Sequence, residues 1–246
     1  MKEYENEVAD RLRSNGLDEA LKKNAREFVR TSIRARYSYN FRWMGRPIIQ
    51  YPQDIVAMQE IIWSVQPDLI IETGIAHGGS LVFSASMLEL NAACGGPADG
   101  SVLGVDIDIR PHNRAAIEHH PLFRRISMIE GSSIAPDVVA RVHAAAVVKH
   151  RVLVCLDSNH TEAHVLAELD AYAPLTSVGS YCVVFDTIVE DLPADAYPDR
   201  PWAPGNSPKS AVRKYLTNHP EFVNDETFDH KLLISVAPGG YLRRIC

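Results

Sequence analysis

The chain has 246 residues, of which 46% are apolar and 23% charged, and its formal net charge is −6. These values are typical of an ordinary water-soluble protein with one main domain, and they exclude sequence-independent binding to nucleic acid, which needs a basic face. The apolar runs are strand-sized and residues 1–16 are charged, so we expect no membrane span, no signal peptide and a cytoplasmic location.

The first 50 residues are expected to form an extension. Residues 3–30 are polar and helix-prone, with apolar positions spaced for a weak amphipathic face, and residues 37–51 are rich in aromatic side chains. This face is too broken to cover a sheet alone, which leaves a contact with a second copy of the chain, as a homo-oligomer, open. We place the main domain at residues 51–246, beginning with a helix over residues 54–66.

Strand-like and helix-like segments then alternate. Apolar runs occur at 68–74, 101–108, 125–131, 151–158 and 180–187, with helix-length segments at 79–91, 111–119, 136–148 and 161–173. Continuous apolar runs are typical of parallel strands buried on both faces, so the pattern predicts a doubly wound, Rossmann-like α/β fold. A Pro-rich loop over 188–208 and a helix over 209–218 follow. Residues 231–246 predict an antiparallel hairpin that turns at Pro238-Gly239-Gly240.

The ends of the predicted strands carry polar residues. Ligands of open parallel sheets bind beyond the carboxyl ends of the strands. The first turn, "ETGIAHGGS" at residues 72–80, is rich in glycine, which lets the backbone approach a ligand closely. Its spacing matches neither GxGxxG nor a phosphate-binding P-loop. Asp106 ends the second strand, where a carboxylate can accept the hydroxyls of a ribose, so a nucleoside-containing cofactor is favoured.

Asp157 and Asp186 follow the fourth and fifth strands. Neighbouring strands lie about 4.8 Å apart, so the two carboxylates can share one Mg²⁺ ion. His160 is three residues beyond Asp157, and its ordinary pKa suits a general base. We therefore predict Asp157 and His160 as catalytic residues. His77, inside the glycine-rich turn, is a competing candidate for the base.

The stretches that carry these residues resemble a known family. They are "PDLIIETGIAHGGSLVF", "VLGVDIDIR", "LDSNHT", "SYCVVFDT" and "APGGYLRRI". Together they resemble the cephalosporin hydroxylase family, which also includes rhamnosyl and related sugar O-methyltransferases. The resemblance runs from about Trp43 to the C-terminus. It implies the fold of class I S-adenosylmethionine-dependent methyltransferases, often with Mg²⁺ at the active site.

The resemblance also implies roles for individual residues. The cofactor-binding residues would be Glu72, Gly74, His77, Gly79 and Ser80 around the methionine end, Asp106 at the ribose, and Ser132 and Ser133 beside the adenine. Hydroxylase-named members carry Asp-Asp after the fourth strand and Glu-Asp after the fifth. This chain has Asp157-Ser158 and Phe185-Asp186 instead, which leaves Asp157 and Asp186 as the metal ligands.

We thus predict methyl transfer from S-adenosylmethionine to a hydroxyl of a sugar, on a surface glycan or a glycosylated metabolite. His160 would accept the proton. The aromatic segment 37–51 and the loop 188–206, with Tyr197 and Trp202, suit an acceptor pocket for a sugar and suit an oligomer contact equally well. Two alternatives remain. One is an oxidative enzyme such as a hydroxylase of natural-product biosynthesis, with iron on His160, His164 and Asp157. The other is a non-catalytic nucleoside-binding protein.

Overall fold

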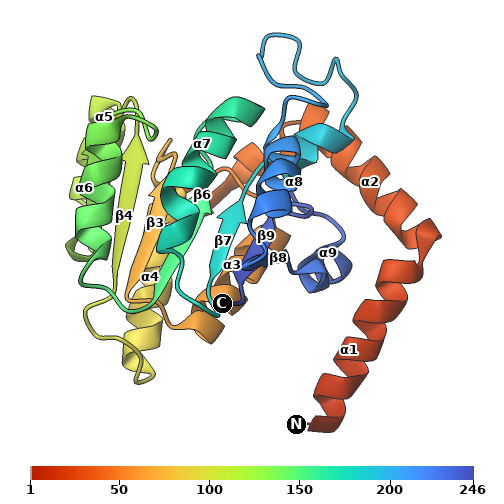
Figure 1. Ribbon diagram of the computed structural model, residues 1–246, viewed down its shortest axis with the longest axis horizontal. Helices are drawn as coiled ribbons and strands as arrows, with labels where there is room; N and C mark the ends of the chain where they lie inside the picture. The colour runs from red at the N-terminus through yellow and green to blue at the C-terminus, as the bar shows by residue number, and fades with distance from the viewer. Residues whose placement is uncertain (1) are drawn as a thin grey trace.

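A seven-stranded sheet forms the centre of the computed structural model, which describes residues 2–246 (Figure 1). Its strands are β3 (Leu69–Thr73), β4 (Ser101–Asp106), β5 (Ile126–Glu130), β6 (Val152–Leu156), β7 (Tyr181–Val184), β8 (Phe222–Asn224) and β9 (Tyr241–Arg244). They lie in the order β5-β4-β3-β6-β7-β9-β8. The first five in this order are parallel, and β9 runs antiparallel to both of its neighbours. The predicted doubly wound, mostly parallel fold is confirmed.

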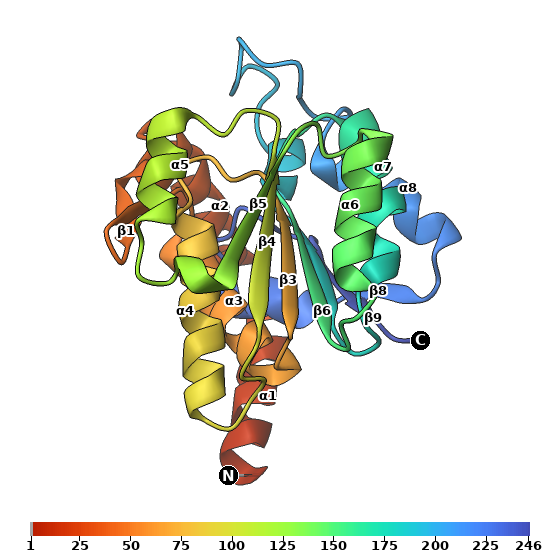
Figure 2. The same cartoon turned by 90° about the vertical axis from the view of Figure 1, so that its left-hand side faces the viewer.

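Helices cover both faces of this sheet (Figure 2). They are α3 (Pro52–Val65), α4 (Gly79–Ala93), α5 (Pro111–Glu118) and α9 (Glu226–Leu232) on one face, and α6 (Pro136–Ala146), α7 (Glu162–Tyr172) and α8 (Pro208–Asn218) on the other. Alternate residues of one strand enter opposite cores: Ile70 packs with the first group and Ile71 with the second. Burial on both faces explains why the strands read as continuous apolar runs. Among residues 2–246 no helix has the length and apolar character to span a membrane.

The C-terminal hairpin differs from the prediction. The antiparallel strands expected there are present, but the partner of β9 is β8, which precedes α9, and residues 233–240 form no strand. The buried carboxylate of Asp54 determines this conformation, because it accepts hydrogen bonds from Ser235 Oγ at 2.6 Å and Val236 N at 3.0 Å. The backbone N–H of Val236, held in this way, cannot pair with a neighbouring strand.

The N-terminal extension starts with two helices rather than one. Helix α1 (Lys2–Leu17) ends before Asp18, whose side chain caps α2 (Glu19–Arg34) by accepting a bond from Leu21 N. Helix α1 buries no residue and lies on the outside of the molecule (Figure 1). A small hairpin of β1 (Phe41–Trp43) and β2 (Arg46–Ile48) then packs on α4. The domain boundary between residues 50 and 51 stays a prediction.

The topology opens a crevice at one place on the sheet. Strand β3 lies between β4 and β6. From β3 the chain continues outward through β4 to β5, and it then crosses to the other side of β3 and continues outward through β6 to β7. Ligands of doubly wound folds bind where the strand order reverses. The register pairs Thr73 with Leu156, which brings the residues after both strands, Gly74 and Asp157, side by side.

Candidate active site

The glycine-rich turn after β3 is held by close backbone contacts. Gly74 has φ +90°, and a Cβ at this position would lie 2.1 Å from the carbonyl oxygen of Asp157. A Cβ on Gly79 would lie 2.1 Å from the carbonyl oxygen of Pro47, because β2 crosses the first turn of α4. Only glycine fits either position. The turn therefore gains its shape from the strand end beside it and from the N-terminal extension.

Asp106 fixes the same turn from the neighbouring strand. Its Oδ2 accepts hydrogen bonds from Ile75 N at 2.7 Å and Ala76 N at 3.1 Å, and its Oδ1 accepts one from Asp108 N. Glu72, which is only 4% exposed, accepts a short hydrogen bond from Ser80 Oγ. The predicted cofactor-binding residues of the turn and of β4 thus form one connected group.

Two cavities flank Gly74 and Ser158, which line both of them. The larger, of about 230 Å³, is lined by segment 47–50, by the glycine-rich turn and by Asp157, His160 and Asp186. The smaller, of about 130 Å³, is lined by Asp106, Ser132, Ser133 and His164 among others. We call them the inner and the outer cavity respectively. A cavity of about 640 Å³ between α2 and residues 224–239 contains none of the predicted site residues.

The inner cavity contains a cluster of two carboxylates and an imidazole. One ligand atom each of Asp157, His160 and Asp186 lies within 4.8 Å of the others. His160 Nε2 is 3.1 Å from Asp186 Oδ2. The carboxylate of Asp157 accepts no hydrogen bond within residues 2–246, so its oxygens are available to a cation or a ligand. We call these three residues the strand-end cluster.

The strand-end cluster lies in an unbalanced negative field. Burial, followed by the charges of Asp186 and Glu72, raises the pKa of Asp157 well above its ordinary value. Burial raises the pKa of Glu72 to about 7 and that of Asp54 to about 6, although hydrogen bonds to both carboxylates lower these pKa values in part. No lysine or arginine lines the inner cavity in the described part of the chain. The site is therefore suited to a positively charged ligand.

Ser158 and Phe185, the chain neighbours of Asp157 and Asp186, direct their side chains away from the cluster. Ser158 Oγ donates to Glu168 Oε1 at 2.6 Å and lies 3.2 Å from His164 Nε2, while Phe185 belongs to the apolar core. His164 also contacts Ser133 Oγ at 3.0 Å, on the side of the outer cavity. An iron site on His160, His164 and Asp157 is therefore not assembled here.

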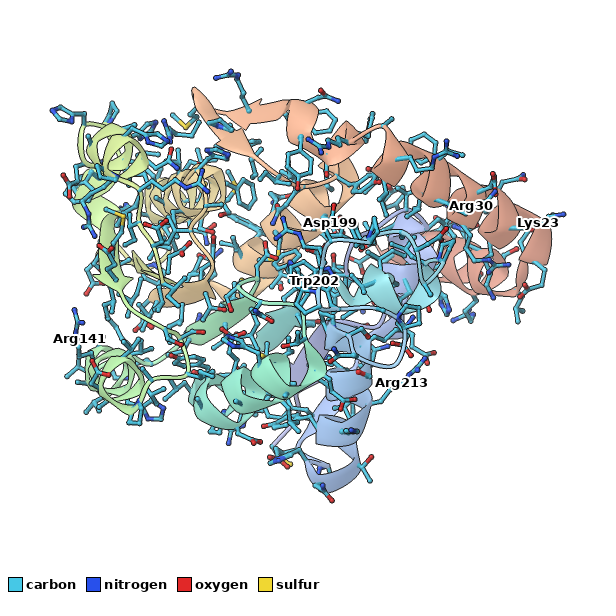
Figure 3. The ribbon with its side chains drawn as sticks, turned by 90° about the horizontal axis from the view of Figure 1, so that it is seen from above. Lys23, Arg30, Arg141, Asp199, Trp202 and Arg213 are labelled. Carbon is cyan, nitrogen blue, oxygen red and sulfur yellow. The ribbon has the colours of Figure 1, made fainter. Side chains whose placement is uncertain are left out.

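Trp202 extends from the Pro-rich loop to the strand-end cluster. Its ring packs edge-to-face on His160, with 4.7 Å between ring centroids, and the guanidinium of Arg200 lies 5.2 Å from the indole centroid. Figure 3, which looks down on the carboxyl ends of the strands, shows Trp202 near the centre of the view. Glu190 anchors the loop by accepting bonds from Gly205 N and Ser207 Oγ.

Two polar residues that line the inner cavity lie outside the main domain, and sequence patterns assign neither of them an individual role. They are Tyr39 and Gln50, both from the N-terminal extension. A single tyrosine in an aromatic stretch, or one glutamine before a helix, gives no chemical signal by itself. The glycine turn does give one, because Gly79 requires a neighbour that approaches its backbone closely.

A family model and the curated relatives of this chain indicate the same protein family. A family model for rhamnosyl O-methyltransferase/CmcI matches residues 35–245. The rhamnosyl O-methyltransferase of Mycobacterium leprae (strain TN) is 30% identical over 204 residues, which cover 82% of this chain and 82% of that protein. The protein of the same name from Mycobacterium tuberculosis (strain ATCC 25618 / H37Rv) is 32% identical over 206 residues, covering 82% and 77%.

Solved structures show the same fold at lower identity. CmcI-D160 with Mg and SAM has a TM-score of 0.58 at 18% identity, covering 85% of this chain and 78% of that chain. The O-methyltransferase from Bacillus cereus in complex with SAH has a TM-score of 0.53 at 14% identity, covering 81% of each. With the family model matching most of its length, the chain belongs to the rhamnosyl O-methyltransferase/CmcI family of S-adenosylmethionine-dependent O-methyltransferases.

Proposed function

We propose that this protein transfers the methyl group of S-adenosylmethionine to a hydroxyl of a sugar, on a surface glycan or a glycosylated metabolite, with the help of Mg²⁺. The observation that carries the proposal is the pair of cavities that meet at Gly74, with the strand-end cluster at the far side of the inner one. A cofactor with a nucleoside at one end and an amino acid at the other suits this division. The names of the curated relatives support a sugar as the acceptor.

The cofactor is assigned to both cavities. Its adenine end would lie in the outer cavity beside Ser132 and Ser133, and its ribose at Asp106, which lines the same cavity. The methionine end would lie in the inner cavity, where the proposed contacts are Glu72, Gly74, His77, Gly79 and Ser80. Gly79 and Ser80, the first residues of α4, line this cavity, and a helix N-terminus favours the carboxylate of the methionine. The negative field around the strand-end cluster favours the sulfonium.

Asp157 and Asp186 are the proposed ligands of Mg²⁺. They fit this ion because hard oxygen donors after two neighbouring strands lie together, and no lysine or arginine among residues 2–246 lines the cavity to compete. When bound, a divalent cation lowers the pKa of a coordinated hydroxyl and fixes its position. Waters and the acceptor would fill the positions for which this chain supplies no carboxylate, since Ser158 and Phe185 point elsewhere.

His160 is the proposed proton acceptor. Asp186 at Nε2 and Trp202 against the ring hold the imidazole in one orientation, which leaves Nδ1 to take the proton. The hydroxyl oxygen then forms a bond to the methyl carbon while the bond from that carbon to sulfur breaks. The products are the methyl ether, S-adenosylhomocysteine and the proton on His160. Orientation and proton removal are the main contributions of the protein, because the sulfonium is already a good leaving group.

The oxidative and the non-catalytic alternatives are not favoured, because the family and its curated relatives are methyltransferases. The test uses the purified protein with S-adenosylmethionine and p-nitrophenyl rhamnoside, and follows the methylated product by mass spectrometry. Asp157→Ala should abolish turnover while calorimetry still detects binding of S-adenosylhomocysteine. Asp108→Ala is the matched control, because this exposed strand-end aspartate lines neither cavity.

Each part of the proposal has its own contrary result. If Asp157→Ala also abolishes binding of S-adenosylhomocysteine, Asp157 belongs to the cofactor site or supports the fold. If EDTA leaves turnover unchanged, the cation has no part in the reaction. If binding of S-adenosylhomocysteine is retained but no sugar hydroxyl is methylated, the acceptor class is wrong.

A further inference from the structure

Gln50 places a buried carbonyl oxygen without a hydrogen-bond partner at the wall of the inner cavity. The side chain is 5% exposed, and its Oε1 has no partner within residues 2–246. Buried polar atoms of native proteins are nearly always paired, so each exception needs a physical reason. A ligand that enters the inner cavity is one such reason, since the residue already lines it.

The backbone on both sides of Gln50 is fixed. Ile48 pairs with Phe41 in the β1–β2 hairpin, and the hydroxyl of buried Tyr51 lies 2.6 Å from Ser32 Oγ on α2. Pro52 then begins α3. The backbone of Gln50 is therefore held between two anchored neighbours before any ligand arrives, which limits the entropy that is lost when a ligand pairs with its side chain.

The surroundings favour a cationic donor as the missing partner. A carbonyl oxygen only accepts hydrogen bonds, so its partner must donate. Within residues 2–246 no lysine or arginine lines the inner cavity, so no cationic side chain competes for this oxygen or repels a cation there. An ammonium group offers three donors and a positive charge, whereas a neutral hydroxyl offers one donor and no charge.

We propose that the Gln50 carbonyl accepts a hydrogen bond from the α-ammonium of S-adenosylmethionine, and that Gln50 thereby recognises the amino-acid end of the cofactor. The inference rests on the proposed function, which assigns the methionine end to the inner cavity. It gives the N-terminal extension a direct part in cofactor binding, through a residue that lies before the first strand of the main sheet.

The test compares two ligands that differ at this end. S-adenosylhomocysteine carries the α-ammonium, and 5′-methylthioadenosine lacks the whole amino-acid part. By calorimetry, Gln50→Met should weaken S-adenosylhomocysteine roughly ten- to hundredfold, the usual loss for a hydrogen bond to a charged group. It should leave the affinity for 5′-methylthioadenosine unchanged. Gln53→Met is the matched control, because Gln53 on α3 also has a buried, unpaired Oε1 but does not line the cavity.

Thermal unfolding separates binding from a structural role. Gln50→Met replaces an unpaired buried amide by an apolar side chain of similar length, so the ligand-free variant should unfold no earlier than the wild type. Earlier unfolding would make Gln50 a structural residue and overturn the inference. Equal affinity of wild type and Gln50→Met for S-adenosylhomocysteine would also overturn it. This holds even if the KM of Gln50→Met for the acceptor rises, because Gln50 would then contact the acceptor and not the cofactor. If the wild type itself fails to bind S-adenosylhomocysteine, the proposed function is at fault instead.

Discussion

Gly74→Ala should damage the protein in two separable ways. A Cβ at Gly74 would lie 2.1 Å from the carbonyl oxygen of Asp157, whereas real Cβ contacts are hardly ever shorter than 3.0 Å. The two strand ends would therefore have to separate by about 0.9 Å. Such overpacking costs ~1–3 kcal/mol, and the left-handed φ costs an alanine a further ~1–2 kcal/mol. The expected loss is roughly 2–5 kcal/mol, which lowers the Tm of a chain of this size by about 4–20 °C.

Gly95→Ala is the control that isolates the backbone conformation. Gly95 has φ +91°, but no atom of residues 2–246 outside its immediate chain neighbours lies within 4 Å of its ideal Cβ, so only the conformational cost of about 1–2 kcal/mol applies. Thermal unfolding measures both variants, and calorimetry measures their affinity for S-adenosylhomocysteine. Only Gly74→Ala should lose affinity, because only this variant displaces the backbone of Asp157. Equal losses of Tm in the two variants would refute the contact argument.

Two further predictions concern charge and the acceptor. Burial raises the pKa of Glu72 from 4.5 to about 7. Between these two pH values the folded protein keeps the proton on Glu72, whereas the unfolded chain releases it. The free energy of unfolding therefore falls as the pH rises from 4.5 to 7. Glu72→Gln should therefore make the Tm decline less over this interval than in the wild type, and parallel profiles would contradict the prediction. Trp202→Ala should raise the KM for a sugar acceptor and leave the Kd for S-adenosylhomocysteine unchanged, since Trp202 covers the strand-end cluster. A weaker Kd in calorimetry would instead give Trp202 a role in cofactor binding.

The strands and helices of the main domain were predictable because burial leaves a clear sequence pattern. Ile70 and Ile71 face opposite cores, and this two-sided burial produced the apolar runs from which the parallel sheet was inferred. The prediction of a hairpin within residues 231–246 was wrong for a non-local reason. Asp54 holds Ser235 and Val236 from 181 and 182 residues away in the sequence, and no local pattern encodes such a bond.

The site was predictable to the extent that strand ends determine it. Asp157, His160 and Asp186 were expected together from their positions after neighbouring strands, and they form one cluster. Their chemical roles remain predictions. The contribution of the N-terminal extension was hidden, because the approach of Pro47 to Gly79 and the burial of Gln50 depend on how the β1–β2 hairpin folds back onto α4.

The position of β9 has a consequence for the order of events during biosynthesis. Residues 241–244 insert between β7 and β8, and Val184 N and Ile188 N, on either side of Asp186, donate to the carbonyl oxygens of Gly240 and Val236. The segment around Asp186 therefore lacks these two hydrogen bonds until the ribosome has added about 55 more residues, which takes roughly 3–11 s. For that time the nascent chain presents β7 as an open sheet edge, which is an opportunity for chaperones and a risk of misassembly. The surroundings of the strand-end cluster are therefore complete only when β9 has paired with β7.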